Sequence, residues 1–170
     1  LSTYVGVRDH AMFLTTLDTG IRPSEMLNLM EDDFDFSGKQ VRLRPEITKT
    51  RTGRILPISQ KTMQAVKELL RIRPVDWRSS PIFCSYEGNK LAIRSWENSK
   101  ILGTKIRPYD LRHTFALLWV RNGGNVFSLQ QTMGHTCLSM TKRYVAFSNE
   151  ELKEEHTRFS PINTLETKRS

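Results

Sequence analysis

Residues 107–116 have the sequence RPYDLRHTFA, and this stretch predicts the beginning of the helix on which the fold depends. Proline suits the first turn of a helix, because its missing N–H group would have no partner there. Leu111, Phe115 and Leu118 then follow at helical spacing and form one apolar face. We therefore expect a core helix over about residues 109–121.

Helical patterns also lie on both sides of this stretch. Upstream, an apolar stripe predicts a helix over residues 7–19, and Gly20 has the residue type that commonly ends a helix. Pro23 is placed to open a second helix, which would carry Leu29 and Met30 inward. Further helices are predicted over residues 59–73, 94–103, 126–133, 138–145 and 149–158.

Residues 33–58 predict strands instead. Val41 and Leu43 alternate with two arginines, the period-two pattern of a half-buried strand, and residues 50–53 suit a turn before a returning strand. The expected fold class is therefore α+β: mostly α-helical, with a small antiparallel β-sheet.

The composition indicates one globular domain of ordinary size. The 170 residues include 38% hydrophobic and 26% charged residues, and the formal net charge is +8. An excess of positive charge favours a polyanionic partner, most commonly a nucleic acid, although it is also compatible with an ordinary solvated surface. No apolar run is long enough to cross a bilayer, and the first residues of this sequence do not have the pattern of a signal peptide.

Cys84 and Cys137 are the two cysteines, and we expect both to be reduced thiols. Neither they nor the four histidines have the spacing of metal ligands. We therefore expect no metal and no cofactor.

Five residues of related chemistry lie in four short segments. Arg22 lies in TGIRPSE, Lys49 in ITKTRTGRILPI, Arg112 in DLRHTFA, and His135 and Tyr144 in MGHTCLSMTKRY. Cleavage of a phosphodiester without a metal requires cations against the charge that builds on the phosphate oxygens, and arginine suits this because its guanidinium pairs bidentately with phosphate. It also requires an acid for the leaving oxygen, and a nucleophile if the DNA end is to be held covalently.

In order and spacing, these segments resemble the motifs of the tyrosine recombinase family, also called the phage integrase family. Lys49 lies eight residues before Pro57 (57 − 49 = 8), His135 lies 23 residues after Arg112 (135 − 112 = 23), and Tyr144 lies nine residues after His135 (144 − 135 = 9). One such motif would be a weak signal, but four in the right order are highly specific. Taken singly, each residue also has an ordinary structural interpretation.

The resemblance covers roughly residues 8–147 and implies a role for each matching residue. Arg22 and Arg112 would grip the scissile phosphate and stabilise the transition state, while His135 would hydrogen-bond the phosphate. Lys49 would protonate the 5′ leaving oxygen. Tyr144 would attack and form a 3′-phosphotyrosyl bond, which the 5′ hydroxyl of a second strand would then displace; two such rounds pass through a Holliday junction.

One position departs from the family pattern. The family usually has histidine three residues before the second arginine, and this chain has Tyr109 there (112 − 109 = 3). A tyrosine hydroxyl can donate a hydrogen bond to phosphate, but it does not exchange protons near neutral pH as imidazole does. We expect Tyr109 to keep a phosphate contact and to contribute less as an acid or base.

Two neighbours of the arginines have other expected roles. His113 follows Arg112 directly and would point elsewhere, since adjacent helical residues differ by about 100°, so we interpret it as a structural, hydrogen-bonded histidine. Glu25 either supports the active site or is a first-turn carboxylate favoured by the helix dipole. We further expect that DNA-backbone contacts are made by Arg51, Arg54, Lys142 and Arg143.

The resemblance also implies an organisation. Residues 1–159 would form the catalytic domain and residues 160–170 a flexible tail, and the family's N-terminal core-binding domain would be absent from this chain, so that it binds DNA weakly. The partner would be double-stranded DNA, with a monomer in isolation and a tetramer on two recombination sites. The helix over 149–158 would pack either on a neighbouring protomer or on its own core. A cytoplasmic, nucleoid-associated protein of a bacterium, an archaeon, a phage or another mobile element is expected.

The expected function is that of a site-specific DNA recombinase or integrase. One alternative is a type IB topoisomerase, which uses nearly the same active site and would relax plasmid DNA as a monomer without pairing two sites. Another is a DNA-binding module that has lost catalysis, which only the departure at Tyr109 favours.

Overall fold

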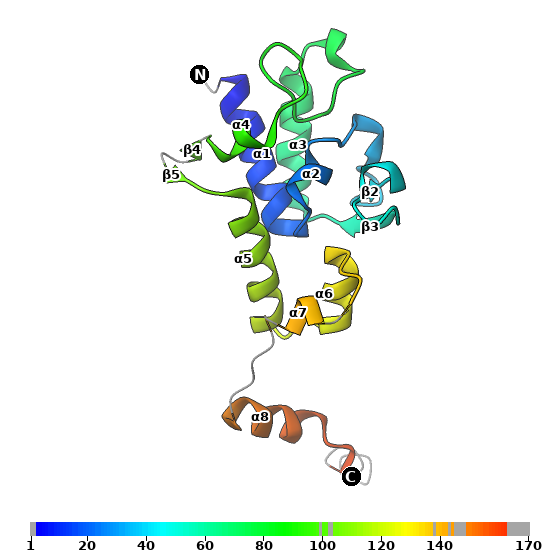
Figure 1. The fold of residues 1–170 in the computed structure, drawn as a ribbon, viewed down its shortest axis with the longest axis vertical. Coiled ribbons are helices and arrows are strands. Elements are labelled where there is room, and N and C mark those ends of the chain that lie inside the picture. The colour runs from blue at the N-terminus through cyan, green and yellow to red at the C-terminus, as the bar shows by residue number, and fades with distance from the viewer. Residues whose placement is uncertain are drawn as a thin grey trace.

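The computed structural model describes residues 3–98, 100–101, 104–137, 139–142, 144 and 149–162. It confirms the α+β prediction: most described elements are helices, and the sheets are small and antiparallel (Figure 1). The helices are α1 (Tyr4–Thr19), α2 (Pro23–Met26), α3 (Gln60–Ile72), α4 (Ile93–Glu97), α5 (Pro108–Arg121), α6 (Val126–Met133), α7 (Ser139–Lys142) and α8 (Asn149–Phe159). The strands are β1 (Phe34–Asp35), β2 (Gln40–Leu43), β3 (Arg54–Pro57), β4 (Lys100–Ile101) and β5 (Thr104–Lys105).

The ends of α1 follow from local chemistry. The helix begins three residues earlier than predicted, because the hydroxyl of Thr3 accepts a hydrogen bond from the backbone N–H of Gly6 at 3.3 Å. It ends as predicted at Gly20, whose φ of 61° is left-handed. A Cβ atom at Gly20 would lie 2.2 Å from the ring of Phe115. The end of α1 therefore packs directly against α5, and glycine permits this approach.

The three-stranded sheet has the order β1-β2-β3, and all its pairs are antiparallel. Val41 pairs with Leu56 and Leu43 with Arg54. Val41, Leu43 and Leu56 are buried while Arg42 is exposed, so the predicted alternation is confirmed. The register fixes Arg54 at the start of β3, where the chain returns from the loop between β2 and β3.

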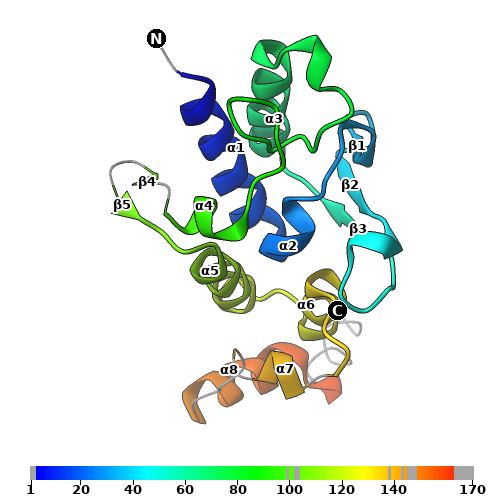
Figure 2. The same ribbon diagram turned by 45° about the horizontal axis from the view of Figure 1, so that its top comes forward.

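The described residues form two hydrophobic cores of unequal size. The larger core joins α1, α3 and the three-stranded sheet, and includes Met12, Leu43 and Leu69. The smaller core lies between α5 and α6 and consists of Phe115, Ala116, Leu129 and Met133. Figures 1 and 2 show α1 and α3 side by side next to the sheet, with α5 leading away from them to α6 and α7.

Three predicted helices are shorter than expected. The helix that begins at Pro23 ends at Met26, because the chain then extends and the carbonyl of Leu29 accepts a hydrogen bond from the N–H of Ile82 at 2.7 Å. Residues 94–103 were predicted as one helix, but α4 ends at Glu97 and the paired strands β4 and β5 follow. The helix predicted over 138–145 is α7, which ends at Lys142.

The side chains of residues 150–159 of α8 are all exposed, so in this structure the helix does not pack on the protein's own core. Figure 1 shows α8 apart from α5, α6 and α7. The flexible tail was predicted over residues 160–170, of which residues 163–170 lie outside the described residues. Among the described helices, none has the length and apolar character needed to span a membrane.

Candidate active site

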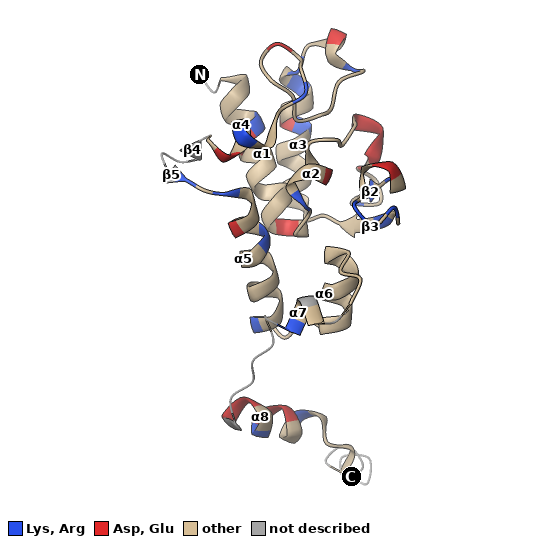
Figure 3. Ribbon diagram, in the orientation of Figure 1, with Lys and Arg blue, Asp and Glu red and all other residues tan. Residues whose placement is uncertain are grey.

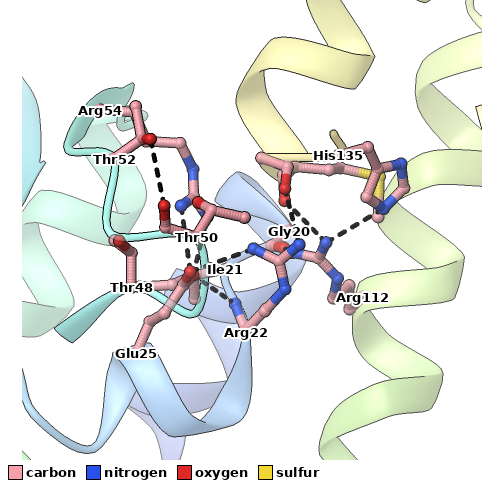
Figure 4. A network of polar contacts seen from close by, with 12 residues as sticks. Gly20, Ile21, Arg22, Glu25, Thr48, Thr50, Thr52, Arg54, Arg112 and His135 are labelled. Atoms are coloured by element: carbon pink, nitrogen blue, oxygen red, sulfur yellow. Dashed lines mark hydrogen bonds and ion pairs between the residues drawn. The ribbon is translucent and has the colours of Figure 1, made fainter. Parts of the chain in front are cut away.

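Glu25 lies at the centre of a buried polar cluster between α2 and β3 (Figure 4). Its carboxylate accepts a hydrogen bond from Arg22 Nη1 at 3.1 Å, and two from Arg54 Nη1 and Nη2 at 3.0 and 2.7 Å. It also accepts the backbone N–H of Arg22 at 3.1 Å. Glu25 is thus a first-turn carboxylate, and it also holds two arginines in place.

The protonation of Glu25 reflects these two partners. Burial alone would raise the pKa of its carboxyl group, but the hydrogen bonds and positive charge of Arg54, followed by those of Arg22, outweigh burial and hold the pKa below the usual 4.5. Glu25 is therefore ionised at neutral pH. It acts as a fixed negative charge that positions two guanidinium groups.

Arg112 projects from α5 toward the ends of α1 and α6. Its guanidinium donates hydrogen bonds to the carbonyl of Gly20 and, at 2.8 Å, to that of Met133, and Nη2 lies 3.2 Å from His135 Nε2. Burial, and then the charge of Arg22, lower the pKa of Arg112 to about 10. The group stays charged at neutral pH, in surroundings that already hold other positive charges.

The contacts of His135 define its tautomer. An arginine N–H can only donate, so Nε2 of His135 accepts from Arg112. In a neutral ring the proton is then on Nδ1, which donates to the hydroxyl of Thr141 at 2.9 Å. Thr141 is fully buried on α7, so the orientation of the ring depends on where α7 lies.

Three guanidinium groups connect the larger core to the smaller one. Arg22 Nη2 donates to the carbonyl of Gly134 at 2.7 Å, and Arg54 Nε donates to that of Thr132 at 2.8 Å. Arg112 makes the third connection, because it lies on α5 beside the smaller core and donates to the carbonyl of Gly20 at the end of α1. The last carbonyls of a helix lack partners within the helix, and here arginines satisfy those of α6.

This cluster has an excess of positive charge. The guanidinium groups of Arg22 and Arg54 pair with the one carboxylate, and that of Arg112 lies near enough to feel their charge, which leaves a net charge of +2 (3 − 1). An open cavity of about 760 Å³, lined by Arg54 and His135, adjoins it between β3 and α6. Figure 3 shows further basic residues near this side, in the loop before β3 and at α7. The arrangement suits an anion that approaches from the cavity.

The other predicted site residues lie around the cluster. Lys49 and Arg51 are exposed in the loop between β2 and β3, and Tyr109 is 48% exposed in the first turn of α5. Within the described residues, the side chains of Lys49 and Tyr109 make no hydrogen bond. Lys142 is exposed at the end of α7, and Arg143 lies outside the described residues. Of the six predicted catalytic residues, Arg112 and His135 are in direct contact, and Arg22 bonds to the carbonyl of Gly134, the residue before His135.

Tyr144 is the sixth predicted catalytic residue, and it lies beside the cluster. Its ring packs on the smaller core, and its hydroxyl lies 2.6 Å from Nδ1 of His113 on α5. His113 is hydrogen-bonded, as expected, but it is exposed and its partner is the predicted nucleophile. The expectation that it points away from the site is therefore wrong.

Two further residues of the site were not identified as such from the sequence. Arg54 was predicted to contact DNA, but its guanidinium is bonded to Glu25 and Thr132, and its side chain is only 10% exposed. Thr141 was not singled out at all, because one threonine in a polar segment carries no pattern. The available signal for Arg54 was the predicted turn over residues 50–53, because it places Arg54 at the start of the returning strand, where the structure pairs it with Leu43.

Comparison with known proteins gives a consistent result. The sequence pattern of the phage integrase family matches residues 2–151. The tyrosine recombinase XerC of Syntrophus aciditrophicus (strain SB) is 31% identical over 171 residues, which cover 92% of this chain and 54% of that protein. XerC of Pelobacter propionicus is 29% identical, covering 92% of this chain and 53% of that protein. The chain spans about half the length of the curated relatives it matches.

Solved structures of related fold agree. The XerA recombinase superimposes with a TM-score of 0.70 at 25% identity, covering 91% of this chain and 57% of that one. The catalytic domain of bacteriophage HP1 integrase gives 0.56 at 29% identity, covering 89% and 81%. The XerH site-specific recombinase bound to its difH substrate gives 0.69 at 21% identity, covering 94% and 49%, and at this identity shows the shared fold alone.

Proposed function

Because this chain belongs to the phage integrase family, we propose that it is the catalytic part of a site-specific DNA recombinase, which breaks and rejoins DNA through a 3′-phosphotyrosyl intermediate. One observation supports this most strongly. Arg22, Arg112 and His135 come from distant parts of the sequence and meet beside an open cavity, in a cluster with excess positive charge. We assign residues 1–159 to this catalytic domain.

Arg22 and Arg112 could bind a phosphate while they keep their present contacts with the protein. A guanidinium has five N–H groups, and within the described residues that of Arg22 uses two of them, on Glu25 and Gly134. The remaining donors of Arg22 and Arg112 would meet the charge that develops on the nonbridging oxygens. Such preorganised donors are each worth about 100-fold to 1,000-fold in rate.

The leaving group would receive its proton from Lys49. This side chain is exposed in the loop between β2 and β3, the loop that leads into Arg54 and the cavity. A phosphate beside Arg54 would therefore lie within reach of the loop. The ammonium proton would pass to the 5′ oxygen as the P–O5′ bond breaks.

The bond that forms would join the phenolic oxygen of Tyr144 to phosphorus. In the reverse step, the 5′ hydroxyl of another strand would attack this phosphotyrosine and release the tyrosine. The energy of the phosphodiester would be kept in the covalent intermediate, so no external energy source is needed. Tyr109, one turn before His113 on α5, would border the same phosphate with its hydroxyl.

Double-stranded DNA would be the partner, bound by a tetramer that holds two recombination sites. The XerH and Tn1549 integrase structures of similar fold contain DNA, and the positive charge of this chain suits a polyanion. The exposed helix α8 carries Leu152 and Phe159, which are 51% and 61% exposed. Packing of this helix on a neighbouring protomer would cover both side chains.

A nicked suicide duplex tests the proposal. Duplexes tiled across the DNA that flanks the coding sequence would carry a nick close to the cleavage position, so that the short cleaved fragment diffuses away and traps the adduct. Wild-type protein should form a covalent protein–DNA adduct, visible by denaturing electrophoresis, whereas Tyr144→Phe should form none. Adduct formation by Tyr144→Phe would show that another residue is the nucleophile.

Failure of the wild type to form any adduct while it binds DNA would favour a non-catalytic binding module. Relaxation of supercoiled plasmid by monomers, without pairing of two sites, would favour a topoisomerase. Neither alternative is favoured by the relatives that the chain matches, which are recombinases.

A further inference from the structure

The hydroxyl of Tyr144 lies within hydrogen-bond distance of a histidine on α5. Nδ1 of His113 lies 2.6 Å from this oxygen, and the two ring centroids are 5.9 Å apart. His113 lies in the turn that also carries Arg112, and four residues after Tyr109, so these three side chains leave neighbouring positions of one helix. The contact therefore lies at the edge of the proposed phosphate site.

Two other titratable groups near the site, Glu25 and His135, already have partners. Glu25 is buried between two arginines, and its pKa is held below the usual value, so it is a poor proton acceptor. Both ring nitrogens of His135 have partners, in Arg112 and Thr141. His113, by contrast, has one ring nitrogen on the tyrosine oxygen and is exposed, which gives a bound proton a route to solvent.

We propose that His113 is the general base that takes the proton of Tyr144 during cleavage, an inference that rests on the proposed function. The O–H bond of Tyr144 breaks and its proton passes to Nδ1 of His113. The phenolate oxygen forms a bond to phosphorus, the P–O5′ bond breaks, and Lys49 protonates the 5′ oxygen. When the strand is rejoined, protonated His113 returns its proton to the departing oxygen of Tyr144.

This step makes two demands that differ from those of a structural hydrogen bond. The acceptor must be able to carry the proton away, so a side chain that can only hydrogen-bond the hydroxyl does not suffice. The defect must also lie on the nucleophile side of the reaction. A substrate with a better leaving group should therefore not restore the rate of a variant that lacks the base. The same substrate should restore the rate of a variant that lacks the acid.

Single-turnover rates of adduct formation on the suicide duplex separate these cases. His113→Ala and His113→Asn should both form the adduct about 100-fold more slowly than wild type at saturating DNA, the usual scale for loss of a general base. Asparagine keeps a polar atom close to the position of Nδ1 but cannot take up a proton. The matched control is His10→Asn, an exposed histidine on α1 far along the chain from the site, which should leave the rate unchanged.

A duplex with sulfur in place of the 5′ bridging oxygen locates the defect. A thiolate leaves without a proton, so Lys49→Ala should recover most of its rate on this duplex, while His113→Ala should stay slow. Addition of free imidazole should restore part of the rate of His113→Ala and none of that of Tyr144→Phe.

The outcomes distinguish this inference from the proposed function. If wild-type protein forms no adduct, the proposed function fails and takes the inference with it. If wild type forms the adduct and His113→Ala matches or exceeds its rate, only the inference is overturned, and a faster rate would show that the contact restrains the nucleophile. A normal rate for His113→Asn would show that His113 holds Tyr144 without taking its proton.

Discussion

The two sides of the proposed site are built on very different foundations. Arg22 and Arg54 lie beside the larger core, and ion pairs bind both to the fully buried carboxylate of Glu25. Tyr144 packs on a core of four residues, and its hydroxyl is held by one exposed histidine. The proposed phosphate-binding side is thus held by several buried ion pairs, whereas the proposed nucleophile depends on fewer contacts.

This difference suggests a division of labour. Groups that stabilise charge are most effective when they are fixed in advance, because no energy is then spent on orienting them during the reaction. A nucleophile must instead approach phosphorus and later leave it. A small core with a single polar contact suits a side chain that moves, and the bonds of Arg22, Arg54 and Arg112 to the opposite core keep the two sides in register.

The largest expected effect follows from removing the negative charge of Glu25, which pairs with Arg22 and Arg54. Glu25→Ala leaves Arg22 and Arg54 without their buried partner, and should lower the free energy of unfolding by about 3–5 kcal/mol, measured by denaturant titration. Glu68→Ala removes an exposed ion pair with Arg71 and is the control, with stability close to wild type. Equal losses in the two variants would show that the buried cluster carries no special weight.

A matched pair of leucines compares the two cores directly. Leu69 and Leu129 are both fully buried, the first in the larger core and the second in the smaller one. Each change to alanine should cost about 3 kcal/mol of stability. At a temperature where both variants stay folded, Leu129→Ala should slow adduct formation about tenfold and Leu69→Ala less than about twofold, since Leu129 lies in the core that supports Tyr144. The reverse order would remove the proposed dependence of the nucleophile on the smaller core.

Two left-handed glycines test the contact between α1 and α5. Gly20→Ala should be destabilised by about 2 kcal/mol, because the new Cβ is strained at φ 61° and collides with the ring of Phe115. Gly123→Ala, at φ 78°, has the same strain and no atom within 4 Å, and should lose only about 1 kcal/mol. The difference between their melting temperatures measures the contact itself, and identical values would show that α5 moves aside freely.

The smallest expected effect is the pH dependence that Glu25 gives to the free energy of unfolding. The pKa of Glu25 in the folded protein lies below the usual 4.5. Its contribution to the free energy of unfolding is therefore fully present above pH 4.5, and it is lost as the pH falls through the lower pKa of the folded protein. Glu25→Gln should lack this contribution. The difference in unfolding free energy between wild type and Glu25→Gln should therefore shrink from neutral pH to about pH 3. A difference that stays constant would contradict ionisation of Glu25 in the folded protein.

Much of the fold could be predicted from local chemistry. The helices predicted over residues 7–19, 59–73 and 126–133 are bounded in the structure by Gly20, Ser59 and Gly134, because a cap is decided by one residue and its immediate neighbours. The strands β4 and β5 could not be predicted, since two residues are too few to show an alternation. They occupy the region where a helix was expected.

The site was predictable in its residue types and less so in its contacts. The spacing of Arg22, Arg112 and His135 predicted a common site, and the structure brings them together. The pairing of Arg54 with Glu25 spans 29 residues and depends on the sheet. The contact of His113 with Tyr144 depends on how α7 returns to α5, which no local pattern specifies.

The bonds between arginines and helix-end carbonyls have a consequence for engineering. Arg22 and Arg112 satisfy the backbone at Gly134, Met133 and Gly20 with some of their N–H groups, and in the proposed function a phosphate would bind the others. DNA would therefore bind the same two guanidinium groups that the protein's own backbone holds in place. A search for heat-resistant variants would favour substitutions that tighten these bonds, and we expect such variants to be slower enzymes, a trade between durability and turnover.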